Sequence, residues 1–278
     1  MIHRLLLLFT LFVCGLSSLC PALLAEEQRP VAGCYGFQIG ENRVLSTYLS
    51  PLRFHGTYFG VYGQWGKALP SNSERVIMNF RTSANFGNLY NPAYTALMTG
   101  VDINASWGIS WRKRFSNNLQ FTAGGIGELE GGAFYLTRNS NNPVCALAAL
   151  RVLGDLSLSY HFNIGRLPVL ISDNCTLPLF GLFFSPQYGE TYYEIYLGNR
   201  SNLLHPGWWG SDFRISNHLA FTLDFGKTAM ELGYRFTFHN QYAENLTLRT
   251  LSHQFTIGII PNGIGLKNRK KEHNYSLY

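Results

Sequence analysis

The sequence predicts an all-β fold, a transmembrane antiparallel up-and-down β-barrel of about ten strands, with twelve strands as the alternative. Three observations lead to this fold class: an export signal at the N-terminus, a composition suited to strands, and long stretches of period-two alternation. Of the 278 residues, 14% are charged and 15% are aromatic, and 28 are glycine. Such a composition favours strands and turns over helices.

The first 25 residues have the order of a secretory signal peptide. Arg4 supplies positive charge, a short apolar run follows from Leu5 to Val13, and the chain becomes polar directly after Ala25. The run is too short to cross a bilayer as a helix, which argues against a retained anchor. A lipoprotein anchored at Cys20 is the other alternative, but bulky Leu19 stands where such a site needs a small residue. We therefore expect residues 1–25 to be removed, 26–260 to form the barrel and 261–278 to be a basic tail.

Alternation of apolar and polar side chains continues for longer than a soluble strand requires. From residue 97 to 112, one set of alternate positions is apolar and ends in two tryptophans, while the other set is mostly small, polar or charged. The pattern recurs over 146–162 and 230–239, and shorter versions occupy 76–87, 119–137, 211–225 and 248–259. Long strands that are apolar outside and polar inside are typical of a barrel in lipid. A soluble two-sheet sandwich is the alternative, and it would leave these apolar faces exposed or crowded.

Short and long connections alternate along the chain, as they do at the two ends of a membrane barrel. Tight links are expected at 115–118, 163–168 and 226–227, and longer polar links at 88–94, 138–144, 185–210 and 240–247. This gives ten strands with both chain ends on the same side. A further hairpin within 185–210 or 42–53 would raise the number to twelve.

Several segments resemble a Bacteroidetes family of exported proteins that carries a domain of unknown function. The matching strings are Val44–Leu52, Asn141–Pro143, Phe184–Glu190, Tyr193–Asn199 and Trp208–Ser211. The resemblance extends from about residue 33 to 260. It implies a β-barrel in the bacterial cell outer membrane, in contact with outer-membrane lipid, and it implies no particular reaction.

Several other classes of protein and site are disfavoured. The net charge is +6, but much of it lies in the terminal run that includes Lys267, Arg269 and Lys270, and basic residues are otherwise scattered. A nucleic-acid surface needs basic residues clustered with aromatic ones, so we expect no nucleic-acid partner. Three cysteines remain after the signal, at wide spacing, which indicates neither a disulfide framework nor a metal site. No motif predicts a cofactor.

Charged side chains at the expected inward positions form a candidate lumen cluster. Its members are Arg151, Asp155, His161, His218, Asp224, Glu231 and Arg235. The turn at Gly226–Lys227 sets a register in which His218 lies opposite Arg235 and Thr222 opposite Glu231. The plainer interpretation is a salt-bridged interior, because buried charges must be paired. The functional interpretation is a polar conduit or a proton-transfer site.

The long connection at 185–211 concentrates aromatic and chemically competent side chains on the expected outer side. Ser211 is a candidate nucleophile, His205 its base, and Glu190 or Glu194 the acid that orients the base. No nucleophile elbow accompanies them. The alternative is that these residues only fold the loop over the rim. Three functions follow in order of preference: a structural or surface-binding barrel, an outer-leaflet hydrolase or acyltransferase acting on lipid, and a narrow channel.

Overall fold

The computed structural model describes residues 31–69, 75–116, 118–140, 142–199 and 201–261. The signal peptide and most of the basic tail expected from the sequence therefore lie outside the described residues. The elements in chain order are β1 (Val31–Ser46), β2 (Arg53–Ala68), β3 (Val76–Tyr90), β4 (Leu97–Arg114), β5 (Leu119–Leu136), β6 (Val144–Ile164), β7 (Leu167–Phe184), α2 (Tyr192–Leu197), β8 (Leu204–Gly207), β9 (Asp212–Asp224), β10 (Ala229–Ala243) and β11 (Leu246–Ile260).

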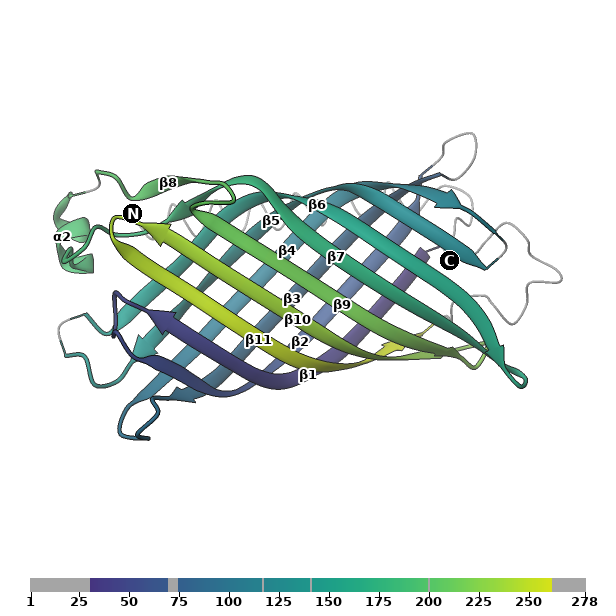
Figure 1. Ribbon diagram of the computed structural model, residues 1–278, viewed down its shortest axis with the longest axis horizontal. Coiled ribbons are helices and arrows are strands. Elements are labelled where there is room, and N and C mark those ends of the chain that lie inside the picture. The colour runs from purple at the N-terminus through teal and green to yellow at the C-terminus, as the bar shows by residue number, and fades with distance from the viewer. Residues whose placement is uncertain (1–30, 70–74, 117, 141, 200, 262–278) are drawn as a thin grey trace. The chain divides into compact units, whose positions relative to one another are not determined.

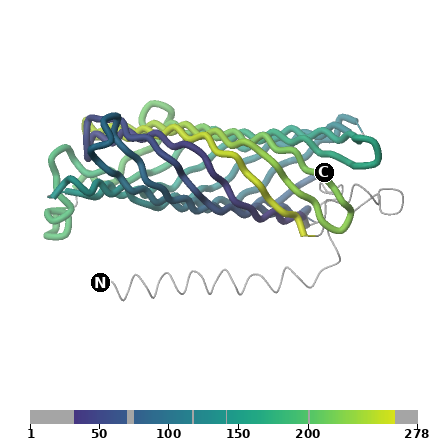
Figure 2. Tube along the Cα trace, turned by 90° about the horizontal axis from the view of Figure 1, so that it is seen from below, coloured from purple at the N-terminus to yellow at the C-terminus, as the bar shows by residue number. Residues whose placement is uncertain are grey.

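Ten of these strands form one closed antiparallel ring, which confirms the predicted fold class and the lower strand number. Each strand pairs with its neighbour along the chain, β7 pairs with β9, and β1 pairs with β11 to close the ring. The short strand β8 pairs only with β7 and does not enter the ring. Figures 1 and 2 show the long strands crossing the barrel obliquely, as closure of a barrel requires.

The alternation in sequence produces an apolar outer face and a mostly polar lumen. On β4, Val101, Ile103 and Trp107 point outward and are 45%, 54% and 54% exposed. Between them Asn104, and further along Ser110, face the interior and are buried. Because every strand of the ring pairs on both sides, with a shorter ladder between β7 and β9, most backbone polar groups are satisfied within the wall, as a lipid environment demands. In the described ranges, no helix is long and apolar enough to cross a membrane.

The connections divide between two ends of the barrel. The terminal end is where β1 begins and β11 ends, and it has the connections 69–75, 115–118, 165–166 and 225–228. The loop end has 47–52, 91–96, 137–143, 185–211 and 244–245, and lies at the left in Figure 1. Neither 47–52 nor 185–211 adds a hairpin to the ring. The prediction of a long link at 240–247 was wrong, because β10 and β11 continue to a two-residue turn.

That turn is made by Glu244 and Asn245, whose φ angles are 50° and 61°. A two-residue hairpin turn that matches the twist of its strands needs positive φ at both positions, and asparagine tolerates this region better than most residues. Ala243 and Leu246 therefore pair directly beside the turn.

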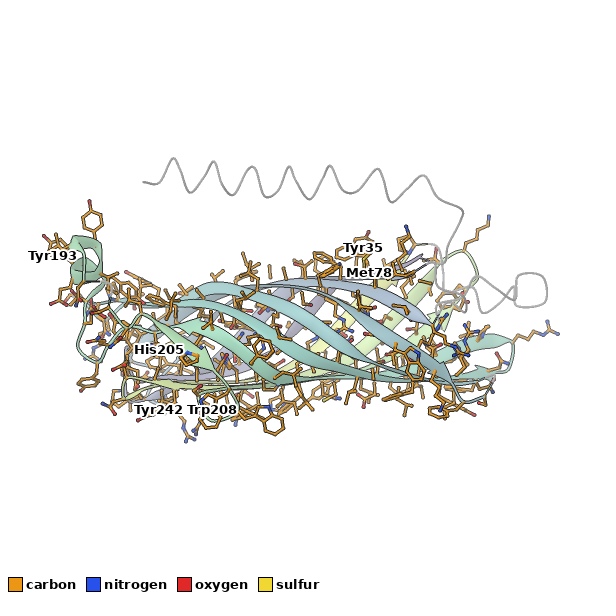
Figure 3. The ribbon with its side chains drawn as sticks, turned by 90° about the horizontal axis from the view of Figure 1, so that it is seen from above. Tyr35, Met78, Tyr193, His205, Trp208 and Tyr242 are labelled. Atoms are coloured by element: carbon orange, nitrogen blue, oxygen red, sulfur yellow. The ribbon has the colours of Figure 1, made fainter. Side chains whose placement is uncertain are left out.

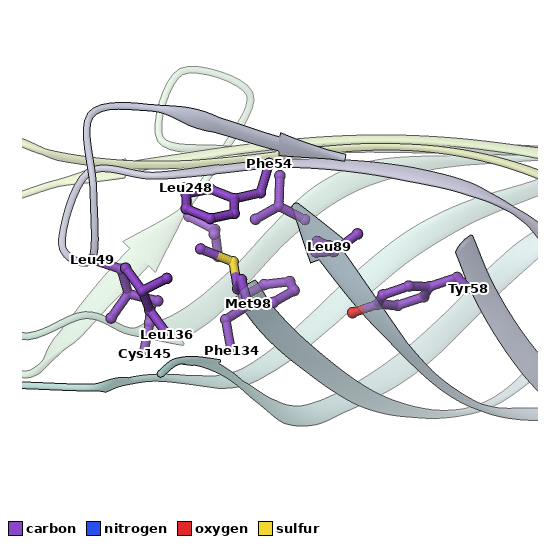
Figure 4. Packing of buried hydrophobic residues seen from close by; sticks show 10 residues of the cluster. Leu49, Phe54, Tyr58, Leu89, Met98, Phe134, Leu136, Cys145 and Leu248 are labelled. Atoms are coloured by element: carbon purple, nitrogen blue, oxygen red, sulfur yellow. The ribbon is translucent and has the colours of Figure 1, made fainter. Parts of the chain in front are cut away.

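The lumen at the loop end is apolar, which the sequence did not indicate. A mouth cluster fills it beside β1 to β6 and β11 (Figure 4), with the members Val44, Leu49, Phe54, Tyr58, Leu89, Met98, Phe134, Leu136, Cys145 and Leu248. Leu49 comes from the 47–52 connection rather than from a strand, and its carbonyl oxygen accepts a hydrogen bond from Asn139 Nδ2 at 2.8 Å. The connection is thereby held down into the barrel.

Candidate functional site

The most heavily charged part of the lumen is an ion cluster centred on Arg151. We call it the lumen ion cluster, and its members are Glu128, Glu130, Arg151, Asp212, Arg214 and His239. Arg151 projects inward from β6 and is 1% exposed. Its Nε lies 2.6 Å from Asp212 Oδ2 and its second terminal nitrogen 3.1 Å from Oδ1, so one carboxylate takes both bonds. Such two-point pairing is the strongest geometry open to a guanidinium and a carboxylate.

Two glutamates on β5 connect Arg151 to a second arginine. The remaining terminal nitrogen of Arg151 lies 2.6 Å from Glu130 Oε2 and 3.3 Å from Glu128 Oε1. Arg214, on β9, lies 2.9 Å from Glu130 Oε1 and 3.2 Å from Glu128 Oε1. Two guanidinium groups thus face three carboxylates, counting Asp212, so most of the buried charge is compensated, as burial requires.

His239 completes the cluster from β10. Its Nε2 lies 2.7 Å from Asp212 Oδ1 and 3.1 Å from a terminal nitrogen of Arg151. A histidine bonded to a carboxylate can act as a base, but here that carboxylate is already bonded twice by Arg151. The arrangement pairs the charges within the lumen, and the described hydrogen-bond partners of His239, which are Asp212 and Arg151, include no hydroxyl or thiol.

A second group of polar residues lies farther toward the terminal end. Arg81 on β3 crosses to Asp155 on β6, with nitrogen–oxygen distances of 2.8 and 3.1 Å. Asp155, 1% exposed, also accepts from Asn174 at 2.8 Å and from Ser110 at 3.2 Å. This group ties β3, β4, β6 and β7 together across the lumen.

The register predicted for β9 and β10 is confirmed. His218 pairs with Arg235 and Thr222 with Glu231. Their side chains nevertheless take partners from other strands, because His218 Nε2 lies 3.0 Å from Thr256 Oγ1 and Glu231 accepts from Tyr62 and Gln64.

Arg235 donates to Gln38 Oε1 at 2.8 Å and lies over the Tyr62 ring. Asp224, at the end of β9, accepts from the Gly226 amide at 2.7 Å and so caps the turn. His161 is buried in the lumen on β6. The seven residues of the predicted lumen cluster therefore belong to several separate contacts rather than to one site.

Two polar cavities lie in the lumen between these groups. The upper cavity, of about 150 Å³, is lined by residues that include Arg214, Arg235 and His239. The lower cavity, of about 110 Å³, is lined by residues that include Cys34 and Glu231. Arg81, Asn174 and His218 line both, so the two cavities adjoin at this layer. A water molecule needs roughly 10–15 Å³ of such space, so each cavity can hold several waters or one small polar group.

The candidate catalytic residues of the 185–211 connection are held in local contacts. His205, on β8, has its Nε2 3.2 Å from the Ser185 carbonyl oxygen, and its ring packs on Phe183. The Ser211 hydroxyl donates to the Pro206 carbonyl at 2.8 Å and accepts from the Trp208 amide at 3.2 Å. Within the described part of the connection, no hydrogen bond joins His205 to Ser211 or either of them to Glu190 or Glu194.

The two glutamates stabilise the loop itself. Glu194 and Thr191 form a capping box at the start of α2, in which each side chain bonds the other residue's backbone amide. The Thr191 amide, and after it the Thr191 hydroxyl, donate to Glu194 Oε2 and lower the pKa of the Glu194 carboxyl. Glu190 is buried and accepts from the Gln187 amide at 3.0 Å. Gly198, with φ of 117°, ends the helix in the left-handed conformation that glycine adopts at low cost.

The same loop folds back over the mouth of the barrel. The Tyr48 hydroxyl donates to the Glu190 carbonyl at 2.8 Å, and the Tyr192 hydroxyl accepts from the Ala146 amide at 2.7 Å. Burial raises the pKa of both tyrosines, that of Tyr48 to about 12, so both hydroxyls keep their protons at neutral pH. In Figure 3, Tyr193 stands on α2 at the tip of the molecule, whereas His205 and Trp208 lie along the wall.

Asp212 and Arg214, central to the lumen ion cluster, were not among the predicted inward residues. They lie at the start of the stretch 211–225 that alternation assigned to a strand, on the same alternate positions as the inward residues His218 and Asp224. This shared parity was the available signal. In the described ranges, no group of three or more histidine, cysteine, aspartate or glutamate side chains could hold a metal ion.

A family model described as a protein of unknown function (DUF3316) matches residues 4–270. The chain belongs to the DUF3316 family. This confirms the predicted resemblance to a family of unknown function, while the Bacteroidetes origin stays a prediction. Among curated proteins, none matches this DUF3316 chain.

Solved structures similar to this DUF3316 protein include barrels of bacterial outer membranes. The outer membrane protease OmpT from Escherichia coli gives a TM-score of 0.46 at 6% identity, covering 84% of this chain and 97% of that one. The transport unit of the autotransporter AIDA-I from Escherichia coli gives 0.44 at 8% identity, covering 86% and 92%. The β domain of the Bordetella autotransporter BrkA gives 0.43 at 6% identity, covering 84% and 99%. None of these likenesses bears on activity.

Proposed function

We propose that this protein is a bacterial outer-membrane barrel that does not conduct solutes and presents its 185–211 connection outside the cell as a binding surface. The observation that carries the proposal is an ordered aromatic loop on a barrel whose lumen is filled. The outer-membrane placement and the binding role are supported by separate features of the molecule.

The placement in a membrane is supported by the outward side chains. Exposed apolar residues of every strand in the ring turn toward the surroundings, including Phe37, Val61, Phe86, Leu129 and Leu150. A soluble protein rarely exposes so much contiguous apolar surface. In lipid the same surface is favourable, and closure of the ring leaves few strand edges unpaired.

The filled lumen argues against a channel. Arg81 and Asp155 are bonded across the lumen, the lumen ion cluster lies nearer the loop end, and the mouth cluster packs apolar side chains beyond it. A conducting pore needs a continuous hydrated path. Here side chains bonded across the lumen interrupt such a path, and Tyr48 and Tyr192 attach the loop over the mouth.

The aromatic loop supports the binding role. Its loop surface consists of Tyr188, Tyr193, Tyr196 and Leu197, which are 74%, 68%, 78% and 65% exposed. The capping box and Gly198 hold α2 in a fixed conformation. Tyrosines give a large contact area at a small cost in conformational entropy, which is why they are common in binding surfaces. Their exposed flat rings also suit stacking against the apolar faces of sugars, so a surface glycan is the partner class to test first.

A glycan array with the refolded barrel tests the binding role. We expect specific binding that falls at least about tenfold in the double variant Tyr193→Ala/Tyr196→Ala, since aromatic contacts of this kind contribute roughly 1–3 kcal/mol each. Leu204→Ala is the matched control, because Leu204 is equally exposed but lies on β8. Binding that is absent, or equal in all three proteins, would contradict the proposal.

A further inference from the structure

The wall of the barrel has a seam between β7 and β9 in its loop-end half. The two strands pair only from Val169 with Leu223 to Thr176 with Ser216. Beyond this point β9 continues to Asp212 and β7 to Phe184, and β8 pairs with β7 only over 181–184. Residues 177–180 and 212–215 therefore have no strand partner across the seam within the described topology. Open strand edges that face lipid are costly, so a seam in a membrane barrel requires an explanation.

Local sequence explains why pairing stops. Pro178 has no amide hydrogen to donate, and the register of β6 with β7 shifts beside it, between Val152 and Leu153. Residues 206–211, which we call the strap, cross the seam where the hydrogen-bond ladder between β7 and β9 is missing. Trp209 Nε1 donates to the Pro178 carbonyl at 2.5 Å, and the Ser211 hydroxyl holds the strap through Pro206 and Trp208. Side-chain bonds of this kind can open one at a time, unlike a strand ladder.

The upper cavity begins directly behind the seam. Thr176 and Ser216, the last pair before the strands separate, both line it. Ser216 pairs with Thr237 on β10, and Arg235 lies two residues along from Thr237 on the same inner face. On neighbouring strands such diagonal positions are about 7–8 Å apart, within reach of a long side chain. The guanidinium of Arg235 is therefore within reach of whatever enters through the seam.

Arg235 differs in its partners from three other arginines of the lumen. Arg81, Arg151 and Arg214 each have a carboxylate within salt-bridge distance. Arg235 bonds the neutral Gln38 and lies over the Tyr62 ring, and no described carboxylate forms a salt bridge with it. Glu231, one layer away, accepts from Tyr62 and Gln64 instead. A cation that faces a polar cavity, with Glu231 near enough to attract it but no described carboxylate within salt-bridge distance, is a suitable site for an anionic group.

The outer side of the seam is apolar. Leu179, Phe180, Trp208 and Trp209 are all more than half exposed around it. A molecule that fits both sides has an apolar body outside the wall and an anionic head inside it. We propose that the β7–β9 seam is a lateral entrance from the membrane, and that Arg235 binds the phosphate of a phospholipid headgroup in the cavity behind it. This inference needs the membrane placement proposed above but not the binding role of the loop surface.

Native mass spectrometry of the protein released from phosphatidylglycerol nanodiscs tests the site. We expect the wild-type protein to retain one phospholipid. Arg235→Gln should lower the retained fraction about tenfold, while Arg235→Lys, which keeps the charge, should retain an intermediate fraction. Heat-modifiable gel mobility verifies that each variant is folded. A folded Arg235→Gln protein that retains lipid as the wild type does would overturn the headgroup site.

Exchange with labelled phosphatidylglycerol tests the entrance. Trp209→Ala removes the bond across the seam, so retained lipid should exchange several-fold faster. Trp107→Ala is the matched control, because Trp107 is a similarly exposed outward tryptophan on β4, away from the seam, and the exchange rate of this variant should stay at the wild-type value. Equal rates in both variants would overturn lateral entry.

A third arm distinguishes the source of the phosphate. In nanodiscs of a phosphate-free glycolipid with added inorganic phosphate, we expect no retained lipid and no protein-bound phosphate. Inorganic phosphate that binds as well as the phospholipid would overturn entry from the membrane. Loss of glycan binding in the earlier test would leave these outcomes unchanged, so the two proposals fail independently.

Discussion

Replacing Arg151 with methionine probes the lumen ion cluster most directly. Arg151→Met keeps much of the side-chain volume but removes the one cation of the described residues that contacts Asp212, Glu130 and Glu128 together. Its two shortest bonds, at 2.6 Å to Asp212 and 2.6 Å to Glu130, are charge-assisted. Bonds of this kind contribute roughly 1.5–3 kcal/mol each when buried.

Part of this loss is compensated by neighbouring groups. Asp212 keeps its bond to His239 at 2.7 Å, and Glu130 keeps Arg214 at 2.9 Å. Breaking one partner of a buried ion pair typically costs about 3–5 kcal/mol, because it leaves uncompensated charge. We therefore expect Arg151→Met to lower the free energy of unfolding by about 4 kcal/mol.

Urea unfolding of the refolded barrel in lipid vesicles, followed by tryptophan fluorescence, measures this change. Arg43→Met is the matched control, since Arg43 is exposed and pairs only with exposed Glu41, and its unfolding curve should coincide with that of the wild type. The double variant Arg151→Met/Asp212→Asn should lose less than the sum of the single losses, because the two residues share one interaction. A loss below about 1 kcal/mol in Arg151→Met would refute the view that the cluster stabilises the barrel.

Five further predictions concern the lumen and the loop end. Planar-bilayer recordings of the wild-type protein should show no steady conductance, and a stable open level would show that the lumen is a pore. Ser211→Ala should lower stability by about 1 kcal/mol and leave the membrane lipid profile unchanged in mass spectrometry, whereas an altered profile in the folded variant would favour the catalytic interpretation. Thr191→Ala should destabilise α2 by about 1 kcal/mol in hydrogen exchange. Folding lowers the pKa of Glu194, so the Glu194 carboxylate should stabilise α2 fully at every pH above the pKa of an unfolded glutamate, about 4.3. This stabilisation should be lost only as the pH falls through the lowered pKa of the folded protein. An NMR titration of the Glu194 carboxyl measures that pKa. Asn245→Ala should cost about 1 kcal/mol in urea unfolding and Asn245→Gly almost nothing, because only alanine resists the positive φ of the turn.

Alternation in the sequence was sufficient to predict the ring, because a side chain on a membrane strand must face either lipid or lumen. The same rule gave the register of β9 and β10, since the tight turn beside Gly226 leaves no freedom to slip. It failed at residues 240–247, where polar residues occupy both faces. The turn is formed by Glu244 and Asn245, which adopt positive φ although neither is glycine. The sequence therefore contained no recognisable turn signal.

The period-two pattern could not predict which inward side chains contact one another across the lumen. Period two assigns Arg151 and Met98 to the same side of the wall, but one meets Asp212 from β9 and the other packs among apolar side chains. Which side chains meet across a lumen depends on strand tilt and on the length of the 185–211 connection. For the same reason His205 and Ser211 looked suitable for catalysis in sequence, yet each bonds the backbone of its own loop.

The pairing of β1 with β11, from Tyr35 with Ile259 to Ser46 with Leu248, also constrains how the molecule is made. The first strand to be synthesised finds one of its two partners only when the last strand has been delivered. Until then, both edges of the growing sheet remain open to proteases and to other unfinished chains. A chain truncated before residue 246 should therefore be degraded during biogenesis rather than accumulate as a smaller barrel, so that synthesis of the fifteen residues of β11 acts as the completion step for the ring.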